Sequence, residues 1–338
     1  MPESFNPNAI LEVSNGFKSA KVLLTAAELG VFTELAKGPQ PFQKLRQRFG
    51  LSNKRSSLDF FDCLVSMGML DLISDGYINT PETDFYLDKN KPSYIGGLLE
   101  MYNDRLYKYW DDFTIALKTG EPQNEAKSGE NFFSALYRDP RKLSQFMNAM
   151  SGISLIPAKV AAERFPWENH NKVADIGCAQ GVFLAEILKA HPHLNGIGFD
   201  LKPVQPIFEN HIRVQELEDS LIFQSGDFFK DPLPEADVLV FGQILHDWSL
   251  KERKVLLEKA HQALPKGGTI LIYEYVIDDG RRTNILALLS SLTMLIETQS
   301  GHDFTGKECR AWMLEAGFDD IEVLPLAGYE SMVIGKKV

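Results

Sequence analysis

The chain has 338 residues, 44% hydrophobic and 24% charged, which is typical of a globular protein of about two domains and excludes disordered, collagen-like and coiled-coil proteins. Asp and Glu outnumber Lys and Arg by 46 to 35, giving a net charge of −11, so we expect no nucleic-acid partner. The three cysteines, Cys63, Cys178 and Cys309, are too few and too far apart for a disulfide framework and favour the cytoplasm.

Neither a targeting signal nor a membrane span is expected. The segment Met1–Ala9 lacks the basic and then apolar pattern of a secretory signal. The longest apolar stretch, Ile285–Ile296, contains Ser290, Ser291 and Thr293 and is shorter than the roughly 20 residues of a spanning helix. We therefore expect a protein that stays inside the cell and has no membrane partner.

The first third of the chain, from Ala9 to about Lys118, has apolar residues at helical spacing. Within it, Ser52 as an N-cap predicts a helix over Arg55–Met67. The short segments Gly68–Ile73 and Tyr77–Ile78, separated by a turn, predict a two-stranded hairpin. A helix followed by such a hairpin is typical of a winged helix.

Winged helices often bind DNA, but the expected recognition helix carries only Lys54 and Arg55 as cations and soon reaches Asp59 and Asp62. Because phosphate contacts need a basic surface, we favour a packing or dimerisation role over DNA binding.

A polar segment, Gly120–Gly129, predicts a long connection to an aromatic helix at Phe132–Tyr137 and to a further helix at Arg141–Ile153. After Pro166, short β-branched segments alternate with helical ones, which is typical of a parallel sheet with helical crossovers. We therefore expect a helical winged-helix domain over residues 1–118, connecting helices over 119–165 and a catalytic domain over 166–338.

The second half predicts an open α/β sheet. Strands are expected at Val173–Ile176, Gly196–Phe199, Leu221–Gln224, Val238–Phe241 and Thr269–Val276, and helices at Gly181–Ala190, Val204–Arg213, Leu250–Leu264, Asn284–Thr298 and Thr305–Ala316. The last two strands, Asp320–Leu324 and Glu330–Gly335, are joined too closely for anything but an antiparallel hairpin. The expected fold class is α/β, a Rossmann-like, mostly parallel sheet that ends in this hairpin.

A candidate ligand loop follows the first of these strands. Asp175 ends the strand, Gly177 allows a turn, and Gly181 starts a helix, so the backbone can approach a ligand closely. A dinucleotide fingerprint would need glycine where Ala179 and Val182 stand, which disfavours NAD. The carboxylate of Asp175 suits an ammonium group better than a pyrophosphate.

Acids also follow the next two strands. Asp200 lies where doubly wound sheets bind a ribose diol. Asp227 could accept a hydrogen bond from an adenine amine, and Phe228 could pack on the ring. Any one of these acids could belong to a simple turn, but their recurrence at consecutive strand ends indicates a nucleotide-sized ligand.

His246 and Glu274 fall at the same expected edge, where open α/β sheets bind ligands. A neutral imidazole titrates near neutrality and can accept a proton from a hydroxyl group. We therefore interpret His246 as a candidate general base.

The segment Ile244–Ser249, which reads ILHDWS, together with the acids at the strand ends, resembles the class I S-adenosylmethionine-dependent small-molecule O-methyltransferases of bacteria and plants over nearly the whole chain. The resemblance implies S-adenosyl-L-methionine as cofactor, His246 as general base, Trp248 beside the adenine, and a homodimer formed through the N-terminal winged-helix domain. It also implies that Glu274 and Asp303 steer the base, although the family more often has glutamate where Asp303 stands.

The same resemblance places Phe146 and Met150 on a helix that lines the acceptor pocket, and Met294 on another. Phenylalanine and methionine suit a flat aromatic acceptor, although by periodicity alone such a pair could equally belong to the core. In the glycine loop, Cys178 and Ala179 replace two glycines of the family pattern.

The sequence therefore predicts methyl transfer from S-adenosyl-L-methionine to a hydroxyl of an aromatic small molecule, by direct displacement and without a metal. The alternatives are a C- or N-methyltransferase or a non-methylating member of the family in natural-product biosynthesis, then a ligand-responsive winged-helix regulator, and last a dehydrogenase.

Overall fold

The computed structural model describes residues 6–125 and 132–338. Contacts divide the chain into two compact units, Met1–Lys108 and Tyr109–Val338. The three-part division expected from the sequence stays a prediction. Residues 1–5 of the N-terminal segment and residues 126–129 of the expected polar connection lie outside the described part.

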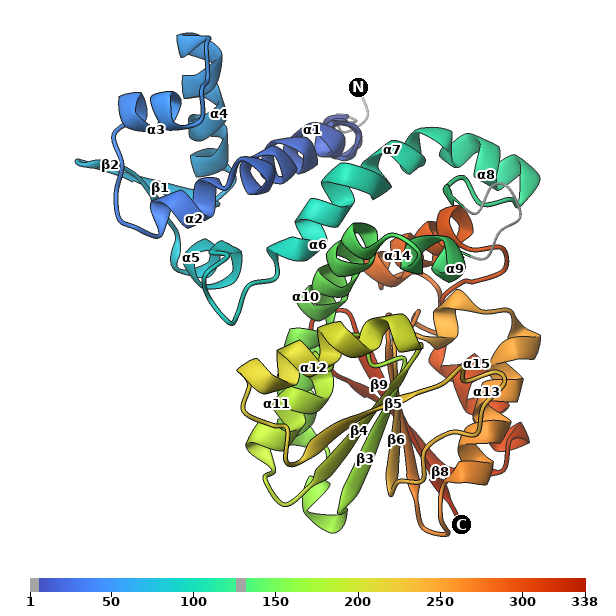
Figure 1. Ribbon diagram of the computed structural model, residues 1–338. Coiled ribbons are helices and arrows are strands. Elements are labelled where there is room, and N and C mark those ends of the chain that lie inside the picture. Colours follow the sequence, from blue (N-terminus) through green and yellow to red (C-terminus); the bar gives the residue numbers. More distant parts are fainter. Residues whose placement is uncertain (1–5, 126–131) are drawn as a thin grey trace. The chain divides into compact units, whose positions relative to one another are not determined.

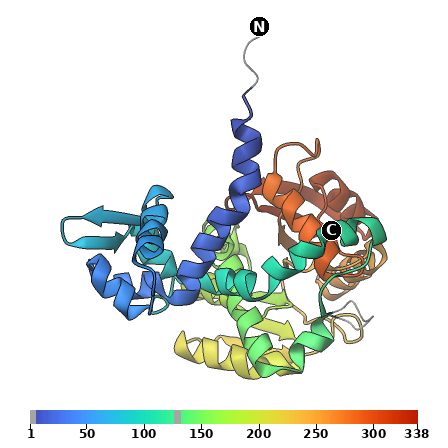
Figure 2. The same ribbon diagram turned by 90° about the horizontal axis from the view of Figure 1, so that it is seen from above.

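The first unit consists of helices and one hairpin. Its elements are α1 (Asn8–Leu29), α2 (Val31–Leu35), α3 (Phe42–Arg48), α4 (Lys54–Ser66), β1 (Leu70–Ile73), β2 (Gly76–Asn79), α5 (Pro81–Leu87), α6 (Gly96–Met101) and the π-helix η1 (Tyr102–Leu106), with α7 (Tyr107–Tyr109) at the division. Figure 2 shows that the first turns of α1 extend beyond the rest of this unit. Every described residue up to Lys21 is exposed.

The expected cap of the second helix of the predicted winged helix was wrong by one residue. The side chain of Asn53, not Ser52, accepts the hydrogen bond from Ser56 N at 3.0 Å, and α4 starts at Lys54. The strands β1 and β2 pair antiparallel, with Leu70 opposite Asn79. The winged-helix interpretation itself stays a prediction.

The second unit alternates strands and helices. Its elements are η2 (Trp110–Asp112), α8 (Phe113–Thr119), α9 (Phe132–Tyr137), α10 (Pro140–Arg164), η4 (Trp167–Asn169), β3 (Lys172–Ile176), α11 (Val182–Ala190), β4 (Asn195–Asp200), η5 (Lys202–Val204), α12 (Gln205–Val214), β5 (Leu221–Ser225), β6 (Val238–Gly242), η6 (Leu245–Asp247), α13 (Leu250–Ala263), β7 (Thr269–Glu274), α14 (Ile285–Glu297), α15 (Gly306–Glu315), β8 (Phe318–Pro325) and β9 (Ser331–Lys337).

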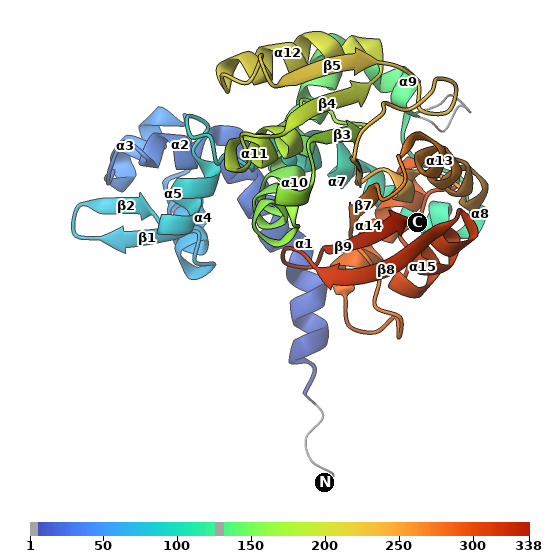
Figure 3. The same cartoon turned by 90° about the horizontal axis from the view of Figure 1, so that it is seen from below.

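The seven strands of this unit form one sheet in the order β5-β4-β3-β6-β7-β9-β8 (Figure 3). The strands β3 to β7 run parallel, and β9 pairs antiparallel with both β7 and β8. In Figure 1, α10, α11 and α12 cover one face and α13 and α15 the other, and a buried apolar cluster lies on each side. The predicted fold class is therefore confirmed.

Several expected boundaries differ from those observed, and two of the differences have a clear structural reason. The helix expected over Arg141–Ile153 runs on to Arg164 as α10 and carries Pro157, because its second half is buried against α11. The strand β7 ends at Glu274 rather than Val276, because Val276 N donates to Glu274 O and turns the chain out of the sheet.

The apolar stretch singled out in the sequence forms α14, which has 13 residues. Among residues 6–125 and 132–338, no helix is both long and apolar enough to cross a membrane.

Candidate active site

The carboxyl edge of the parallel strands gathers most of the candidate residues. Asp200 and Glu274 are the last residues of β4 and β7, Asp175 is the penultimate residue of β3, and His246 lies in η6 just after β6. Since these strands are neighbours and run in the same direction, their acids share one rim, where open α/β sheets bind ligands.

His246 is buried among three carboxylates. Its Nδ1 lies 3.2 Å from Asp303 Oδ1 and 3.6 Å from Glu274 Oε2, and its Nε2 lies 3.7 Å from Asp247 Oδ1. Glu274 is held in turn by its Oε1, which accepts hydrogen bonds from Ile244 N at 3.1 Å and Leu245 N at 2.8 Å. The acid at the end of β7 therefore contacts both the backbone and the imidazole of the segment that carries the candidate base.

The charges of this cluster alter its protonation. Burial by itself lowers the pKa of His246, but the negative charges of Glu274, Asp247 and Asp303 outweigh burial and raise that pKa to about 10. Burial raises the pKa of Glu274 to about 7 and that of Asp247 to about 6, each offset in part by the charge of His246. The three acids thus favour the imidazolium form, which is the product of proton abstraction.

Two oxygens of the cluster, Glu274 Oε2 and Asp303 Oδ2, are buried and have no hydrogen-bond partner among the residues that the structure describes. His246 Nδ1 and one carboxylate oxygen from each of these acids lie within 4.8 Å of one another. This three-donor set could bind a metal as well as a proton, so the metal-free mechanism expected from the sequence needs a direct test.

Arg253 was not predicted as part of the site. Its side chain on α13 is fully buried, and its Nε donates to Leu245 O at 2.8 Å. It also donates to His302 O, which links η6 to the segment that carries Asp303. No pattern in the sequence indicated this residue, since arginines on amphipathic helices are usually exposed.

The glycine loop is held by side-chain packing as well as by its backbone. Gly177 and Gly181 have φ of 78° and 84°, in the left-handed region. A Cβ at Gly177 would lie 2.3 Å from Ile244 Cδ1, and one at Gly181 would lie 2.5 Å from Phe208 Cε2. The backbone conformation, together with packing inside the protein, therefore favours glycine at both positions, whatever ligand the loop binds.

The two acids below this loop are buried. Burial, together with the charge of Asp200, raises the pKa of Asp175 to about 8. Burial likewise raises the pKa of Asp200 to about 6, although its carboxylate accepts hydrogen bonds from Ala179 N at 2.9 Å and Leu201 N at 2.7 Å. Two buried acids of this kind fit a cationic ligand, which would stabilise their ionised forms.

Asp227 is engaged within its own turn. It accepts a hydrogen bond from Phe229 N at 2.9 Å and pairs with Lys230 at 2.8 Å. Neighbouring Phe228 and Phe229 both contact Trp248 edge to face, and the buried Trp248 Nε1 has no hydrogen-bond partner among residues 6–125 and 132–338. The predicted adenine side of the site is thus an aromatic cluster that contains an indole donor.

Two aromatic residues of α9, which the sequence did not single out, extend this cluster. The ring of Phe133 stacks on that of Trp248 with 5.8 Å between the ring centroids. It also contacts Phe146 edge to face, with 6.3 Å between the centroids. Burial and the charges of Asp200 and Asp247 raise the pKa of Tyr137 well above its ordinary value. The aromatic composition of Phe132–Tyr137 was visible in the sequence, but its packing partners were not.

The predicted acceptor residues lie on two helices. Phe146 and Met150 are half-buried on α10, and Met294 is half-buried on α14. On the same helix as Met294, the Ser291 hydroxyl accepts a hydrogen bond from Asp303 N at 3.2 Å. The face of α14 that carries Ser291 is therefore tied to the carboxylate cluster.

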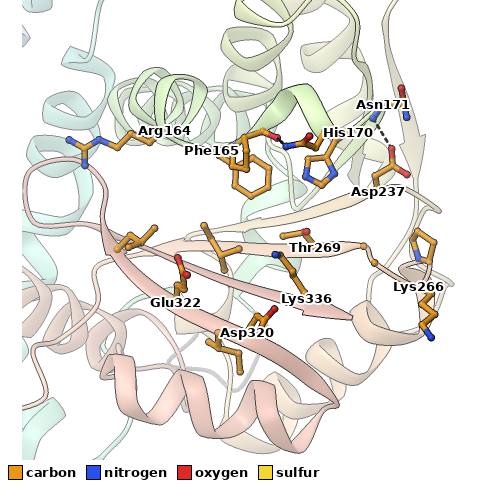
Figure 4. Close-up of a pocket in the computed structure, with 18 of the residues that line it drawn as sticks. Arg164, Phe165, His170, Asn171, Asp237, Lys266, Thr269, Asp320, Glu322 and Lys336 are labelled. Carbon is orange, nitrogen blue, oxygen red and sulfur yellow. Dashed lines mark hydrogen bonds between the residues drawn. The ribbon is translucent and has the colours of Figure 1, made fainter. Parts of the chain in front are cut away.

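A separate cavity of about 1120 Å³ lies at the opposite edge of the sheet. Figure 4 shows Asn171, Asp237 and Thr269 among its lining residues, and these precede or begin the strands β3, β6 and β7. Because this is the amino edge of the parallel strands, the cavity is distinct from the His246 site, and none of the candidate residues lines it.

Comparison with known proteins identifies the chain. A family model described as an O-methyltransferase domain matches residues 110–319. The tetracenomycin polyketide synthesis 8-O-methyl transferase TcmO of Streptomyces glaucescens is 38% identical over 332 residues, 98% of this chain and 97% of that protein. The N,N-dimethyltransferase OxyT of Streptomyces rimosus is 32% identical over 311 residues, 92% of this chain and 90% of that protein.

The fold agrees with these relatives. The crystal structure of human N-acetylserotonin methyltransferase in complex with SAM matches this chain with a TM-score of 0.90 at 28% identity, covering 100% of this chain and 99% of that chain. The family resemblance inferred from ILHDWS and the strand-end acids is confirmed. The chain therefore belongs to the O-methyltransferase family and is an S-adenosylmethionine-dependent methyltransferase.

Proposed function

We propose that this enzyme methylates a hydroxyl group of an aromatic small molecule, with His246 as the general base and without a metal. The observation that carries the proposal is the placement of His246 Nδ1 between Asp303 and Glu274, at 3.2 and 3.6 Å. This arrangement orients the imidazole and leaves Nε2 without a hydrogen bond in the part of the chain that the structure describes.

Each residue of the cluster then has a defined task. His246 Nε2 accepts the hydroxyl proton, and the carboxylates of Asp303, Glu274 and Asp247 stabilise the resulting imidazolium. When bound, the cofactor supplies a methyl group already activated by its sulfonium. The chain's remaining contribution is alignment of the acceptor and exclusion of water.

The cofactor site that we propose consists of the predicted residues Asp175, Gly177, Gly181, Asp200, Asp227, Phe228 and Trp248. The buried carboxylates of Asp175 and Asp200 suit the cationic and hydroxyl groups of S-adenosyl-L-methionine. The aromatic cluster around Trp248 suits its adenine ring.

An aromatic acceptor fits the other side of the site. Phe146, Met150 and Met294 are half-buried, and Phe146 is linked through Phe133 to Trp248. Such rings bind a flat molecule by stacking and apolar contact. The relatives named for a polyketide and for N-acetylserotonin support this class of acceptor.

The test is product analysis with methyl-deuterated S-adenosyl-L-methionine and a panel of polycyclic and bicyclic phenols. Mass spectrometry should find the labelled methyl on oxygen in a phenol, and His246→Ala should lose most of this turnover. Labelled methyl on nitrogen in amine-bearing analogues would instead support the alternative for which the relative named as an N,N-dimethyltransferase argues. Absence of label from every product would reject methyl transfer.

The finer statements about assembly and location are also proposals. The exposed residues Ile10, Val13 and Phe17 form an apolar stripe along α1, at 73%, 84% and 58% exposure, which supports a homodimer. Native mass spectrometry should find a dimer that Val13→Asp weakens and Ser19→Asp, on the opposite face of α1, does not. Cys63, Cys178 and Cys309 are all free, which supports the cytoplasm.

A further inference from the structure

A buried pair that the chemistry above does not use, Gln243 and Glu330, lies at the end of β7. Gln243 follows the last residue of β6, and Glu330 precedes the first residue of β9. The strands β6 and β9 flank β7 on either side. Glu274 of β7 is paired with Ser331 of β9 in the sheet, and Glu330 is the residue just before Ser331.

The two side chains join across β7. Gln243 Nε2 donates a hydrogen bond to Glu330 Oε1 at 2.9 Å, and the two residues are only 9% and 5% exposed. A hydrogen bond between buried groups is costly to break, because each partner then loses solvation without compensation. The pair therefore acts as a clasp over the strand end that carries Glu274.

The backbone at Gln243 explains what the clasp holds. Gln243 has φ of 54°, a left-handed conformation that is unfavourable for a non-glycine residue. Its N–H donates to Tyr273 O at 3.0 Å, and the next two N–H groups, of Ile244 and Leu245, donate to Glu274 Oε1. The bend at Gln243 thus directs the chain that leads to His246 towards Glu274.

The charge on Glu330 matters as well as its hydrogen bond. Burial, and then the negative charge of Glu274, raise the pKa of Glu330 to about 8, while Gln243 and the charge of His246 act in the opposite direction. Tyr273 of β7 also interacts electrostatically with Glu330. Glu330 is mostly neutral at pH 7, and its ionisation adds a negative charge behind the Glu274–His246 pair.

We propose that Gln243 and Glu330 are positioning residues that hold Glu274 against His246. The inference rests on the proposed function in that it assigns the clasp to the same general base. Neither residue touches the reacting atoms. Their effect passes through the bend at Gln243 and through Glu274.

Three variants separate the hydrogen bond from the charge. Glu330→Gln keeps an acceptor for Gln243 but cannot ionise. Glu330→Ala removes the acceptor. Gln243→Asn is one methylene too short to reach Glu330 but tolerates the left-handed backbone. A matched control is Asp237→Asn, which weakens the hydrogen bonds that Asn171 N and Lys172 N donate to Asp237 at the opposite edge of the sheet.

The primary measurement is an NMR titration of the His246 imidazole in the full-length protein, which does not depend on turnover. Glu330→Ala and Gln243→Asn should lower the pKa of His246 by about one unit or more, as Glu274 is released. The His246 titration curve of Glu330→Gln should match that of the wild type below pH 8. Above pH 8, where Glu330 of the wild type is ionised, the imidazole of the variant should lose its proton at lower pH. Asp237→Asn should change thermal stability but not this titration.

Kinetics supply the second measurement. With a phenol that the wild type methylates, and with kcat compared on the plateau above the pKa of His246, Glu330→Ala and Gln243→Asn should lower kcat by up to about tenfold, since a 1.4 kcal/mol loss is a tenfold effect. The KM for the cofactor should stay within about twofold of the wild type. The double variant should be no worse than either single one, because the two residues act as a unit.

An unchanged His246 pKa in folded Glu330→Ala and Gln243→Asn would overturn the clasp, whatever the enzyme methylates. If the wild type methylates no phenol but the His246 pKa shifts as expected, the proposed acceptor fails and the clasp stands. If Glu330→Ala does not fold, Gln243→Asn and Glu330→Gln decide the matter by the same titration.

Discussion

Asp303 Oδ1 lies 3.2 Å from His246 Nδ1, so this acid reaches the imidazole although it is one methylene shorter than the glutamate more usual in the family. The backbone compensates for the shorter side chain. Asp303 N donates to the Ser291 hydroxyl of α14, and Arg253 holds the preceding carbonyl, His302 O. Asp303 is thus fixed from both sides before any ligand binds.

Loss of the imidazole should abolish the base without abolishing cofactor binding. In His246→Ala, kcat should fall by about 10² to 10⁴, the range that a positioned general base contributes. Calorimetry with S-adenosylhomocysteine should give a Kd within about threefold of the wild type, because the proposed cofactor residues remain. Unchanged turnover would exclude His246 as the base.

Two substitutions separate the effect of the negative charge of Asp303 from the effect of its side-chain size. Asp303→Asn keeps the side-chain size but removes the charge, so kcat on the plateau above the pKa of His246 should fall about tenfold as the imidazolium loses one of its partners. Asp303→Glu restores the charge with the longer side chain and should keep kcat within about threefold. If Asn is as active as Glu at this position, the carboxylate is not needed.

The rate should depend on pH in the direction that the cluster dictates. Because the pKa of His246 is raised to about 10, most of the imidazole is protonated at pH 7, and kcat/KM should rise with pH between about 7 and 10. Glu274→Gln removes the largest of the charges that raise this pKa, so the rising limb should move to lower pH. A pH profile that is flat from 7 to 9 in the wild type would contradict the assignment.

The raised pKa of His246 also makes the stability of the folded protein depend on pH. This contribution to stability falls with rising pH, whereas the reaction rate rises. A histidine whose pKa is raised in the folded state stabilises that state fully below its unfolded value, near 6.5, and this contribution disappears as the pH rises through about 10. Thermal unfolding should therefore show a larger gap between the wild type and His246→Gln at pH 6 than at pH 10. A gap that grows with pH would indicate that His246 is neutral in the folded protein.

Metal removal tests whether the three donors, His246, Glu274 and Asp303, bind a metal ion. Dialysis against EDTA should leave methyl transfer unchanged, because the proposed mechanism needs only that a neutral His246 accept a proton. Loss of activity that zinc or magnesium restores would show that His246, Glu274 and Asp303 hold a metal. Metal analysis of the purified protein supplies the control.

The approximate positions of the strands, the mostly parallel sheet and the identity of the rim acids followed from the sequence, because β-branched segments that alternate with helical ones are typical of this class of fold. Arg253, Tyr137 and Glu330 could not be found in this way. Each becomes important only through a partner far away in the chain, and Gln243 to Glu330 spans 87 residues. Helix ends such as Asn53 and Arg164 escaped for a local reason, since neighbouring residues cap almost equally well and packing decides between them.

The two side chains that replace glycines in the cofactor loop should respond oppositely to reversion. Ala179 has φ of 49°, and its N–H donates to Asp200 Oδ2, so Ala179→Gly relieves backbone strain and keeps that bond. We expect the free energy of unfolding to rise. The gain should be no more than about 1 kcal/mol, because glycine also adds entropy to the unfolded chain and so offsets part of the relieved strain.

Cys178 is different, because it is 5% exposed and belongs to the apolar cluster that also contains Phe208. Cys178→Gly should lower the free energy of unfolding by about 1 to 2 kcal/mol, as the lost thiol leaves a void. Urea unfolding of both variants, with calorimetry of S-adenosylhomocysteine binding, checks the pair. If Ala179→Gly is the less stable of the two, the left-handed conformation of Ala179 is not strained, and the loop tolerates a side chain there at no cost.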